Sequence, residues 1–181
     1  MRVLGIAGSP RPGGNSASLL DVALSTAIER GDRVERLWLR RLDIRPCTAC
    51  DGCRRGPACI IEDDMTRVYA GLNHADVVVI ATPVYFYDMS AWVKVMVDRT
   101  YALTDGDDRP RLPAGKKLYV LTSQEDADPG LGRDVVATLG RAFSWAGLEL
   151  VGSLVATGLS GPGDWREHPD FVEAARALLA G

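Results

Sequence analysis

The stretch DVVVIAT, from Asp76 to Thr82, is apolar at almost every position. A strand with one exposed face alternates apolar and polar residues, whereas a strand covered on both faces is apolar throughout. This stretch therefore predicts a central strand in a sheet that carries helices on both sides. The fold class follows, because sheets covered in this way are mostly parallel and belong to α/β proteins.

The rest of the chain alternates strand-length apolar runs with segments of helical period. The expected strands are residues 3–7, 34–39, 76–82, 117–123 and 148–159. The expected helices include residues 20–28, 65–72, about 90–101, 135–143 and 171–179. Strict alternation with right-handed crossovers predicts one domain over residues 1–181, with a five-stranded parallel sheet of order 2-1-3-4-5 and helices on both faces.

The composition, 46% apolar and 25% charged residues, is typical of a globular protein with a packed core. A net charge of −3 at pH 7 gives no electrostatic reason to expect nucleic acid or a membrane surface as partner. We expect no signal peptide, because the first ten residues lack the long apolar segment and the small-residue cleavage site of one. We expect no membrane span, because no apolar run reaches roughly 18 residues. The cysteines are clustered, unlike those of disulfide-stapled secreted domains, so we expect a cytoplasmic protein.

Ligands of open parallel sheets bind beyond the carboxyl ends of the strands. The loop after the first strand, GSPRPGGNS, leads into a helix N-terminus, where free N–H groups favour a phosphate. It matches neither the Walker loop nor the dinucleotide glycine pattern, and its short polar side chains suit a terminal monophosphate. The alternative is that Asn15 or Ser16 only caps the helix and the glycines only turn the chain. The candidate phosphate ligands are Ser9, Arg11, Gly14, Asn15 and Ser16.

The loop TPVYFYDMS, after the third strand, places three consecutive aromatic residues beside Pro83. They cannot all point into one core, so we expect some to line a flat apolar ligand or to meet a partner chain. A local aromatic cluster under the loop is the alternative. The loop TSQEDADPG, after the fourth strand, offers polar groups that can hydrogen-bond the edge of a ring, namely Thr122, Ser123 and Gln124.

A Cys-rich loop over about residues 43–63 contains all four cysteines of the chain: Cys47, Cys50, Cys53 and Cys59. Four thiolates at this spacing can surround an iron–sulfur cube. Zinc is a second alternative, although the paired cysteines of zinc sites are usually separated by a longer stretch. Metal-free thiols or one disulfide are the third. Three arginines flank the cysteines: Arg45, Arg54 and Arg55. Their positive charges could offset the negative charge of a cluster or lower the pKa values of the thiols.

Three stretches together resemble the NAD(P)H-dependent FMN reductase branch of the flavodoxin-like superfamily. They are GSPRPGGNS, the run from PCTACDGC through the fourth cysteine to DDM, and ATPVYFYDMSAWVKVMVDR. The resemblance covers about residues 1–125. It implies a flavodoxin-like three-layer sandwich with bound FMN, whose phosphate is held by Ser9, Arg11, Asn15 and Ser16. It implies that the isoalloxazine ring lies against Pro83, Val84, Tyr85, Phe86 and the Thr122–Ser123 loop.

Within that branch, the cysteine run resembles the run of the iron–sulfur flavoproteins, where four thiolates hold a 4Fe–4S cluster. The resemblance thus implies a cluster on Cys47, Cys50, Cys53 and Cys59, although many similar relatives are flavin or quinone reductases without one. The assignment of these four residues as cluster ligands rests on the resemblance, because their spacing alone is also compatible with a zinc site or with free thiols.

The implied function is an FMN-dependent NAD(P)H oxidoreductase of the flavin- or quinone-reductase type, with a small-molecule or protein electron acceptor. The alternatives are an iron–sulfur flavoprotein that carries single electrons without its own small substrate, and a non-catalytic flavin-binding regulator. No catalytic side chain is expected, because the flavin carries the redox chemistry. We expect His74 and His168 to be surface residues. We expect Asp98–Arg99 to cap and to form ion pairs near a helix end, with a role toward the substrate as the alternative.

The helix after the aromatic loop contains AWVKVMV, whose apolar side chains cover more than one face. One face can pack on the sheet, and the remaining apolar surface is more than a soluble monomer usually exposes. A twofold contact with a second copy would cover it. We therefore expect a homodimer or a dimer of dimers, with the flavin near the interface as the resemblance implies. The apolar residues of this helix are Trp92, Val93, Val95, Met96 and Val97.

Overall fold

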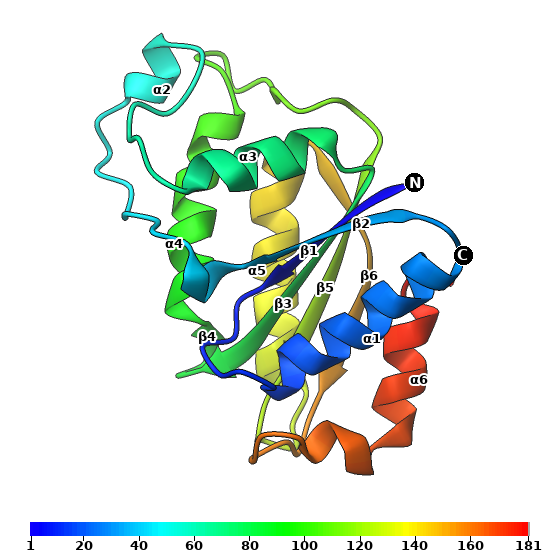
Figure 1. Cartoon of the computed structure of the whole chain (residues 1–181). Coiled ribbons are helices and arrows are strands. Elements are labelled where there is room, and N and C mark those ends of the chain that lie inside the picture. The colour runs from blue at the N-terminus through cyan, green and yellow to red at the C-terminus, as the bar shows by residue number, and fades with distance from the viewer. Residues whose placement is uncertain (181) are drawn as a thin grey trace.

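The computed structural model describes residues 1–180 and has one sheet between two layers of helices (Figure 1). The long strands are β1 (Arg2–Ala7), β2 (Arg33–Trp38), β3 (Val77–Tyr85), β5 (Lys116–Ser123) and β6 (Leu148–Ala156). They pair in parallel in the order β2-β1-β3-β5-β6. The predicted α/β fold and the order of its five parallel strands are confirmed.

The prediction of only five strands is wrong, because a short sixth strand, β4 (Asp88–Met89), pairs antiparallel with the end of β3. The stretch predicted as a loop is therefore a hairpin with Phe86 and Tyr87 at its tip. Both tip residues have positive φ, 47° and 69°, as the central residues of a type I′ turn require. Asn-Gly or Gly-Gly usually marks such a turn, and neither occurs here.

Two apolar cores lie on the two faces of the sheet. Helices α3 (Met65–His74), α4 (Ala91–Arg99) and α5 (Gly130–Trp145) cover one face, and α1 (Asn15–Glu29) and α6 (Pro169–Ala177) cover the other (Figure 1). Successive side chains of a strand point to opposite faces. On β3, Val78 and Ile80 belong to the first core. Val77 and Val79 belong to the second, so β3 is buried on both sides, as its sequence predicts.

Short elements complete the chain: the 3₁₀ helices η1 (Leu39–Arg41), η2 (Thr100–Leu103) and η3 (Asp164–Glu167), and the one-turn helix α2 (Gly52–Arg55) inside the Cys-rich loop. Among residues 1–180, none of the helices is long and apolar enough to cross a membrane. Since the main strands run in parallel, their carboxyl ends share one edge of the sheet, and the connecting loops that leave this edge meet there.

Candidate functional site

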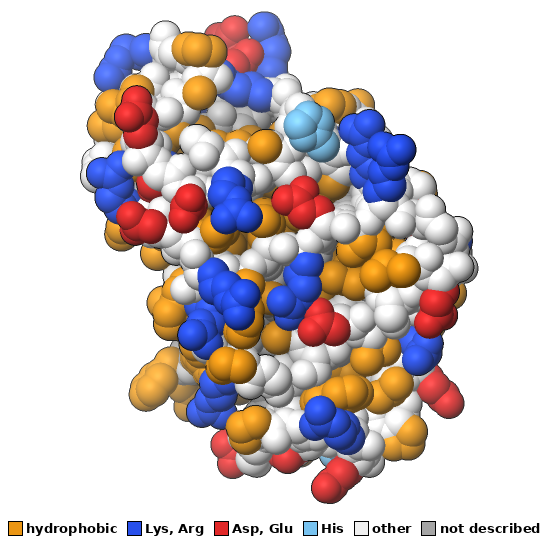
Figure 2. Space-filling model, viewed as in Figure 1, with side chains coloured by type: hydrophobic (Ala, Val, Ile, Leu, Met, Phe, Trp, Pro, Cys, Tyr) orange, Lys and Arg blue, Asp and Glu red, His pale blue; other side chains and the backbone are white. Residues whose placement is uncertain are grey.

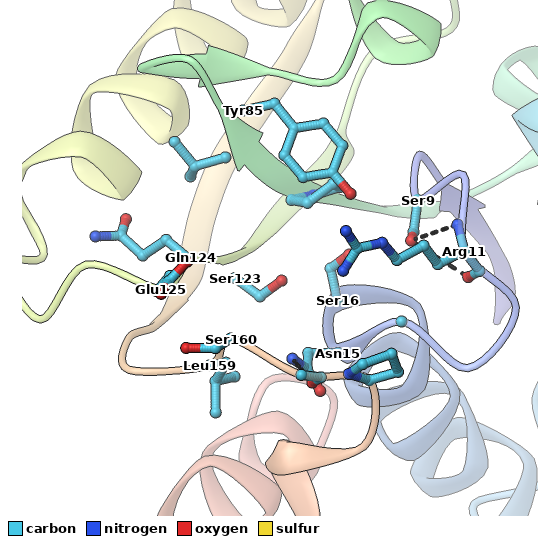
Figure 3. Close-up of a pocket in the computed structure, with 15 residues that line it drawn as sticks. Ser9, Arg11, Asn15, Ser16, Tyr85, Ser123, Gln124, Glu125, Leu159 and Ser160 are labelled. Atoms are coloured by element: carbon cyan, nitrogen blue, oxygen red, sulfur yellow. Dashed lines mark hydrogen bonds between the residues drawn. The ribbon is translucent and has the colours of Figure 1, made fainter.

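A pocket of about 160 Å³ opens at the carboxyl edge of the sheet, between the loops that follow β1, β3, β5 and β6 (Figure 3). All but two of the predicted cofactor-binding residues line it: Ser9, Arg11, Gly14, Asn15, Ser16, Pro83, Val84, Tyr85 and Ser123. Three loops that are far apart in the sequence thus meet at one site, as expected for a parallel sheet.

Sequence reasoning missed the fourth loop of the pocket, residues 159–162. This loop follows β6, so the carboxyl-edge rule itself contains the signal that would have found it. Gln124 N donates to Ala156 O at 2.9 Å, and Gln124 O accepts from Leu159 N at 2.9 Å. These bonds tie the loops after β5 and β6 together, and they place Gln124 and Glu125 in the pocket lining as well.

The loop after β1 is a tight turn held by its own polar groups. Ser9 Oγ accepts from Arg11 N at 3.2 Å, and Arg11 O accepts from Gly14 N at 3.2 Å. A Cβ on Gly14 would lie 2.5 Å from Ser9 Oγ, so a larger residue there would displace the Ser9 hydroxyl from this turn. The side chain of Arg11 extends into the pocket between Ser16 and Tyr85 (Figure 3).

Helix α1 begins at the pocket, and no side chain caps its N-terminus. Its first N–H groups have no partners inside the helix, and together with the helix dipole they favour an anion. Ser16 is 1% exposed, and its Oγ has no hydrogen-bond partner. A buried hydroxyl of this kind calls for a ligand or a water molecule. The free helix end, the Ser16 hydroxyl and the Arg11 guanidinium therefore fit a phosphate monoester.

Asn15 braces the pocket with its side chain. Nδ2 donates to Gly161 O at 2.9 Å, and Oδ1 accepts from Gly163 N at 3.2 Å and from Trp165 N at 3.4 Å. The side-chain amide of Asn15 is therefore hydrogen-bonded to the loop after β6, and the backbone N–H of Asn15 can bind a ligand. The alternative in which Asn15 or Ser16 caps α1 is wrong, because Gly14 occupies the cap position without a side-chain hydrogen bond.

The opposite wall of the pocket is formed by Pro83, Val84 and Tyr85. Phe86 lies outside this lining, since the hairpin tip leaves it 99% exposed. Thr122 is also outside it, because its side chain is buried toward α5. A Cβ on Gly132 of that helix would lie 2.8 Å from Thr122 Oγ1. Of the Thr122–Ser123 pair, only Ser123 reaches the pocket.

Ser90, which sequence reasoning also missed, joins the two main loops of the site. Its Oγ donates to Gly8 O at 2.7 Å and accepts from Val93 N at 3.4 Å, so it caps α4 and holds the loop after β1. Its N–H donates to Thr82 Oγ1 at 3.0 Å. Because Ser90 is buried, this network fixes the distance between the two walls of the pocket.

The two histidines lie outside the pocket lining. His74 is exposed, as predicted. His168 is half-buried and stacks on Phe171, with 5.3 Å between the ring centroids, so the prediction of a surface residue holds only in part for it.

The cysteines form a separate feature between η1 and α3. Cys47 and Cys50 are exposed, Cys59 is half-buried and Cys53 is buried, and all four are free thiols. Within residues 1–180, no three or more His, Cys, Asp or Glu side chains are grouped so that they could hold a metal ion. The donor atoms are of the type that an iron–sulfur cluster or zinc prefers, but their placement does not form one centre.

Two neighbouring cysteines have opposite surroundings. The backbone N–H of Gly52, and then the side chain of Thr48, hydrogen-bond the Cys50 thiol and lower its pKa. Burial raises the pKa of the Cys53 thiol, and the negative charge of Cys59 raises it further. As free thiols, Cys50 is therefore the more reactive nucleophile of the two.

A buried ion pair anchors the Cys-rich loop. Arg99 Nη1 lies 2.6 Å from Asp63 Oδ2, and each side chain is 1% exposed. Nη1 also donates to Arg45 O at 2.7 Å, and Nη2 donates to Cys59 Sγ at 3.5 Å. The prediction that Asp98–Arg99 forms an ion pair near a helix end is confirmed for Arg99, whose partners lie at both ends of the loop. The prediction that the pair caps the helix is wrong, because Thr100 is the C-cap of α4.

The family model for NADPH-dependent FMN reductase matches residues 1–148 of this chain. An iron–sulfur flavoprotein from Methanosarcina thermophila is 37% identical over 103 residues, which cover 57% of this chain and 54% of that protein. The Bacillus subtilis protein YwqN, named as a candidate NAD(P)H-dependent FMN-containing oxidoreductase, is 27% identical over 98% of this chain and 97% of its own. The chain spans about half the length of the iron–sulfur flavoproteins that it matches.

Solved structures share the fold. The NAD(P)H:quinone oxidoreductase from Methanothermobacter marburgensis is 20% identical, with a TM-score of 0.80 over 99% of this chain and 94% of that chain. Smu.1420 from Streptococcus mutans is 16% identical, with a TM-score of 0.78 over 99% of both chains. At these identities the likeness supports the flavodoxin-like sandwich and nothing further.

Proposed function

The chain belongs to the NADPH-dependent FMN reductase family, and we propose that it is an FMN-dependent oxidoreductase that takes electrons from NAD(P)H. The observation that carries this proposal is the buried Ser16 hydroxyl, which has no partner and lies in the pocket at the uncapped N-terminus of α1. A wall of apolar and aromatic groups faces it. Such a pocket suits a flat ring with a monophosphate tail.

The bound flavin supplies the redox chemistry, and the residues of the chain bind and orient it. We assign the FMN phosphate to Arg11, to the Ser9 and Ser16 hydroxyls and to the backbone at Gly14 and Asn15. We assign the ring to the wall formed by Pro83, Val84 and Tyr85, with Ser123 at its edge. Phe86 and Thr122 border this site without lining it.

The electron acceptor that we propose is a small molecule of the flavin or quinone type, or a protein. No side chain is assigned as acid or base, because the bound flavin would supply the redox chemistry and the residues of the chain would only position it. The clustered spacing of the cysteines, unlike the scattered pairs of secreted domains, supports a cytoplasmic location as part of this proposal.

Replacing both Arg11 and Ser16 by Ala should weaken FMN binding by about 10- to 100-fold, because hydrogen bonds to a charged group contribute about 1.5–3 kcal/mol. Riboflavin, which lacks the phosphate, should lose less than about threefold. Flavin fluorescence during titration of the apoprotein measures both affinities. Arg33→Ala with Ser25→Ala is the matched control, since both residues lie away from the pocket lining. Equal losses for the two flavins would contradict the assignment of the phosphate.

We also propose that the chain forms a homodimer or a dimer of dimers through α4. Val93 and Met96 of this helix are buried against the sheet. Trp92 is 42% exposed, and with Val95 it borders an apolar groove on the other side of the helix. The segment from η1 onward lines the other side of that groove with three apolar residues and one acidic residue, namely Leu39, Leu42, Ile44 and Asp43. A twofold contact would cover this second apolar face.

The change Trp92→Glu should therefore convert the assembly into monomers at micromolar concentration, because a carboxylate cannot be buried there without a partner. Light scattering measures the mass of the wild-type and variant proteins. Trp145→Glu is a matched control, since Trp145 is 39% exposed on a different helix. A wild-type protein that is monomeric at micromolar concentration would overturn the dimer.

A second candidate function, an iron–sulfur flavoprotein that carries single electrons, is supported by the relatives of that name, one of them 37% identical over 103 residues. The anchoring of the Cys-rich loop is consistent with it. Arg99 fixes Cys59 from inside the protein and joins the loop to α4, which begins beside the pocket at Ser90. In this proposal, Cys47, Cys50, Cys53 and Cys59 are the cluster ligands, and the Cys-rich loop must rearrange to bring their thiolates to one centre. Iron and sulfide analysis of protein purified without oxygen separates this function from that of a reductase without a cluster.

A further inference from the structure

Three guanidinium groups surround the indole ring of Trp38, the last residue of β2. The Cζ atoms of Arg41, Arg40 and Arg36 lie 4.6, 5.0 and 5.5 Å from the ring centroid. An aromatic face attracts cations, so the indole holds together like charges that otherwise repel one another. In Figure 2, Lys and Arg side chains gather over the place where β2 ends and η1 follows in Figure 1.

These charges are only partly neutralised. Arg36 forms an ion pair with Asp21, with 2.6 Å between Nε and Oδ1. Arg40 and Arg41 have no acidic partner among residues 1–180. The whole chain has a net charge of −3, so the charge of this positive patch is opposite in sign to the net charge of the protein. An uncompensated group of fixed cations attracts anions.

The patch is attached to the phosphate loop of the pocket. Trp38 Nε1 donates to Ser9 O at 2.8 Å, and Arg40 Nη1 donates to Pro10 O at 3.0 Å. Arg11 of the same loop points into the pocket (Figure 3). The loop therefore has one cation, Arg11, directed into the pocket, and a second, Arg40, bonded to its outer side. Arg41 lies beside Arg40 on the Trp38 ring without bonding the loop. FMN has a single phosphate, assigned here to the pocket, so the charges of Arg40 and Arg41 are available to a second anion.

We propose that Arg40 and Arg41 bind the 2′-phosphate of NADPH and make NADPH the preferred reductant over NADH. This inference rests on the proposed function, in which a nicotinamide coenzyme must dock beside the FMN pocket. NADPH differs from NADH only in this phosphomonoester, which carries close to two negative charges. Guanidinium groups bind such a phosphate with paired N–H···O bonds. Trp38 acts as a positioning residue that holds the two arginines in place.

Arg41→Ala is the first test, because the Arg41 side chain does not hydrogen-bond the phosphate loop. In the FMN-loaded protein it should lower the ratio of kcat/KM for NADPH to that for NADH by about tenfold, and Arg40→Ala with Arg41→Ala should lower it further. Arg41→Glu should reverse the preference, because a carboxylate repels the phosphate. Arg33→Ala removes the same charge from the opposite end of β2 and should leave the ratio unchanged.

A second measurement requires no turnover. Calorimetric titration of the FMN-loaded protein should show that 2′,5′-ADP binds at least about tenfold more tightly than 5′-AMP. This advantage should vanish in the double variant and should shrink as salt is added. Equal affinities in the wild-type protein would overturn the inference.

An unchanged coenzyme ratio in the double variant, with weaker binding of an acidic protein instead, would also overturn the inference and assign the patch to protein docking. If neither coenzyme reduces the flavin of the wild-type protein, the proposed function is wrong. The comparison of 2′,5′-ADP with 5′-AMP still decides whether the patch recognises a 2′-phosphate.

Discussion

Replacing Arg99 by Ala should lower the free energy of unfolding by about 3–5 kcal/mol, because it leaves the Asp63 carboxylate buried without its partner. Each of these side chains is 1% exposed, so water cannot substitute for the lost pair. The carbonyl oxygens of Arg45 and Ile61 lose a donor as well. The loss is a large fraction of the roughly 5–15 kcal/mol that stabilises a typical domain. Urea unfolding with an unchanged m value measures it.

The matched control is Arg109→Ala. Arg109 Nη1 lies 3.3 Å from Asp107 Oδ2, but these side chains are 75% and 71% exposed, so the change should cost less than about 1 kcal/mol. If Arg99→Ala is too unstable to purify, Arg99→Lys retains the charge without the guanidinium fork and should show an intermediate loss. A loss for Arg99→Ala no larger than that of the control would contradict the structural role of the pair.

The same pair predicts how the wild-type protein responds to acid. Burial raises the pKa of the Asp63 carboxyl, but the hydrogen bonds from Arg99 and from the backbone N–H groups of Arg45 and Met65 lower it by more, and the result is below the usual value. The stability that comes from this carboxylate is therefore present above the pKa of the unfolded chain. It is lost as the pH falls through the folded pKa. In Arg99→Ala this loss on acidification should be smaller.

The architecture could be predicted because its signals are local. The continuous apolar run of β3 and the helical spacing of α5, where Val135, Leu139 and Phe143 are all buried, each indicate an element without reference to the rest of the chain. The hairpin after β3 could not be predicted in this way. Phe86 and Tyr87 adopt positive φ without the Asn or Gly that usually marks a type I′ turn, so this conformation depends on the pairing of Val84 with Met89.

The pocket could be predicted only as far as its loops carry distinctive residues. The loop at 159–162 contributes mainly small residues, and its place in the site depends on Asn15, which lies 146 residues from Gly161 along the chain. The partner of Arg99 was hidden for the same reason, since Asp63 is 36 residues away. In the sequence, Ser90 looks like an ordinary helix cap. Its hydrogen bond to Gly8 O could not be predicted, because it forms only when β1 and β3 have paired.

Each single change of Cys47, Cys50, Cys53 or Cys59 to Ser should remove iron and sulfide together if the four thiolates hold one cluster, because a cube that lacks one ligand does not assemble. FMN content should stay unchanged, since other loops build the pocket. Iron, sulfide and flavin analysis, with the visible spectrum of protein purified without oxygen, measures both. Ala58→Ser adds a hydroxyl to the same loop without removing a thiol, and this control should retain its iron.

Free thiols predict a graded pattern. Cys50 is exposed and its thiol pKa is lowered, so it should react fastest with a disulfide reagent, and Cys50→Ser should remove the fastest phase. Cys53 is buried and its pKa is raised, so Cys53→Ser should remove the slowest phase. A cluster makes the four variants alike, whereas free thiols make each one different. Wild-type protein that holds no stoichiometric iron, although iron and sulfide were supplied during expression, would decide for the reductase without a cluster.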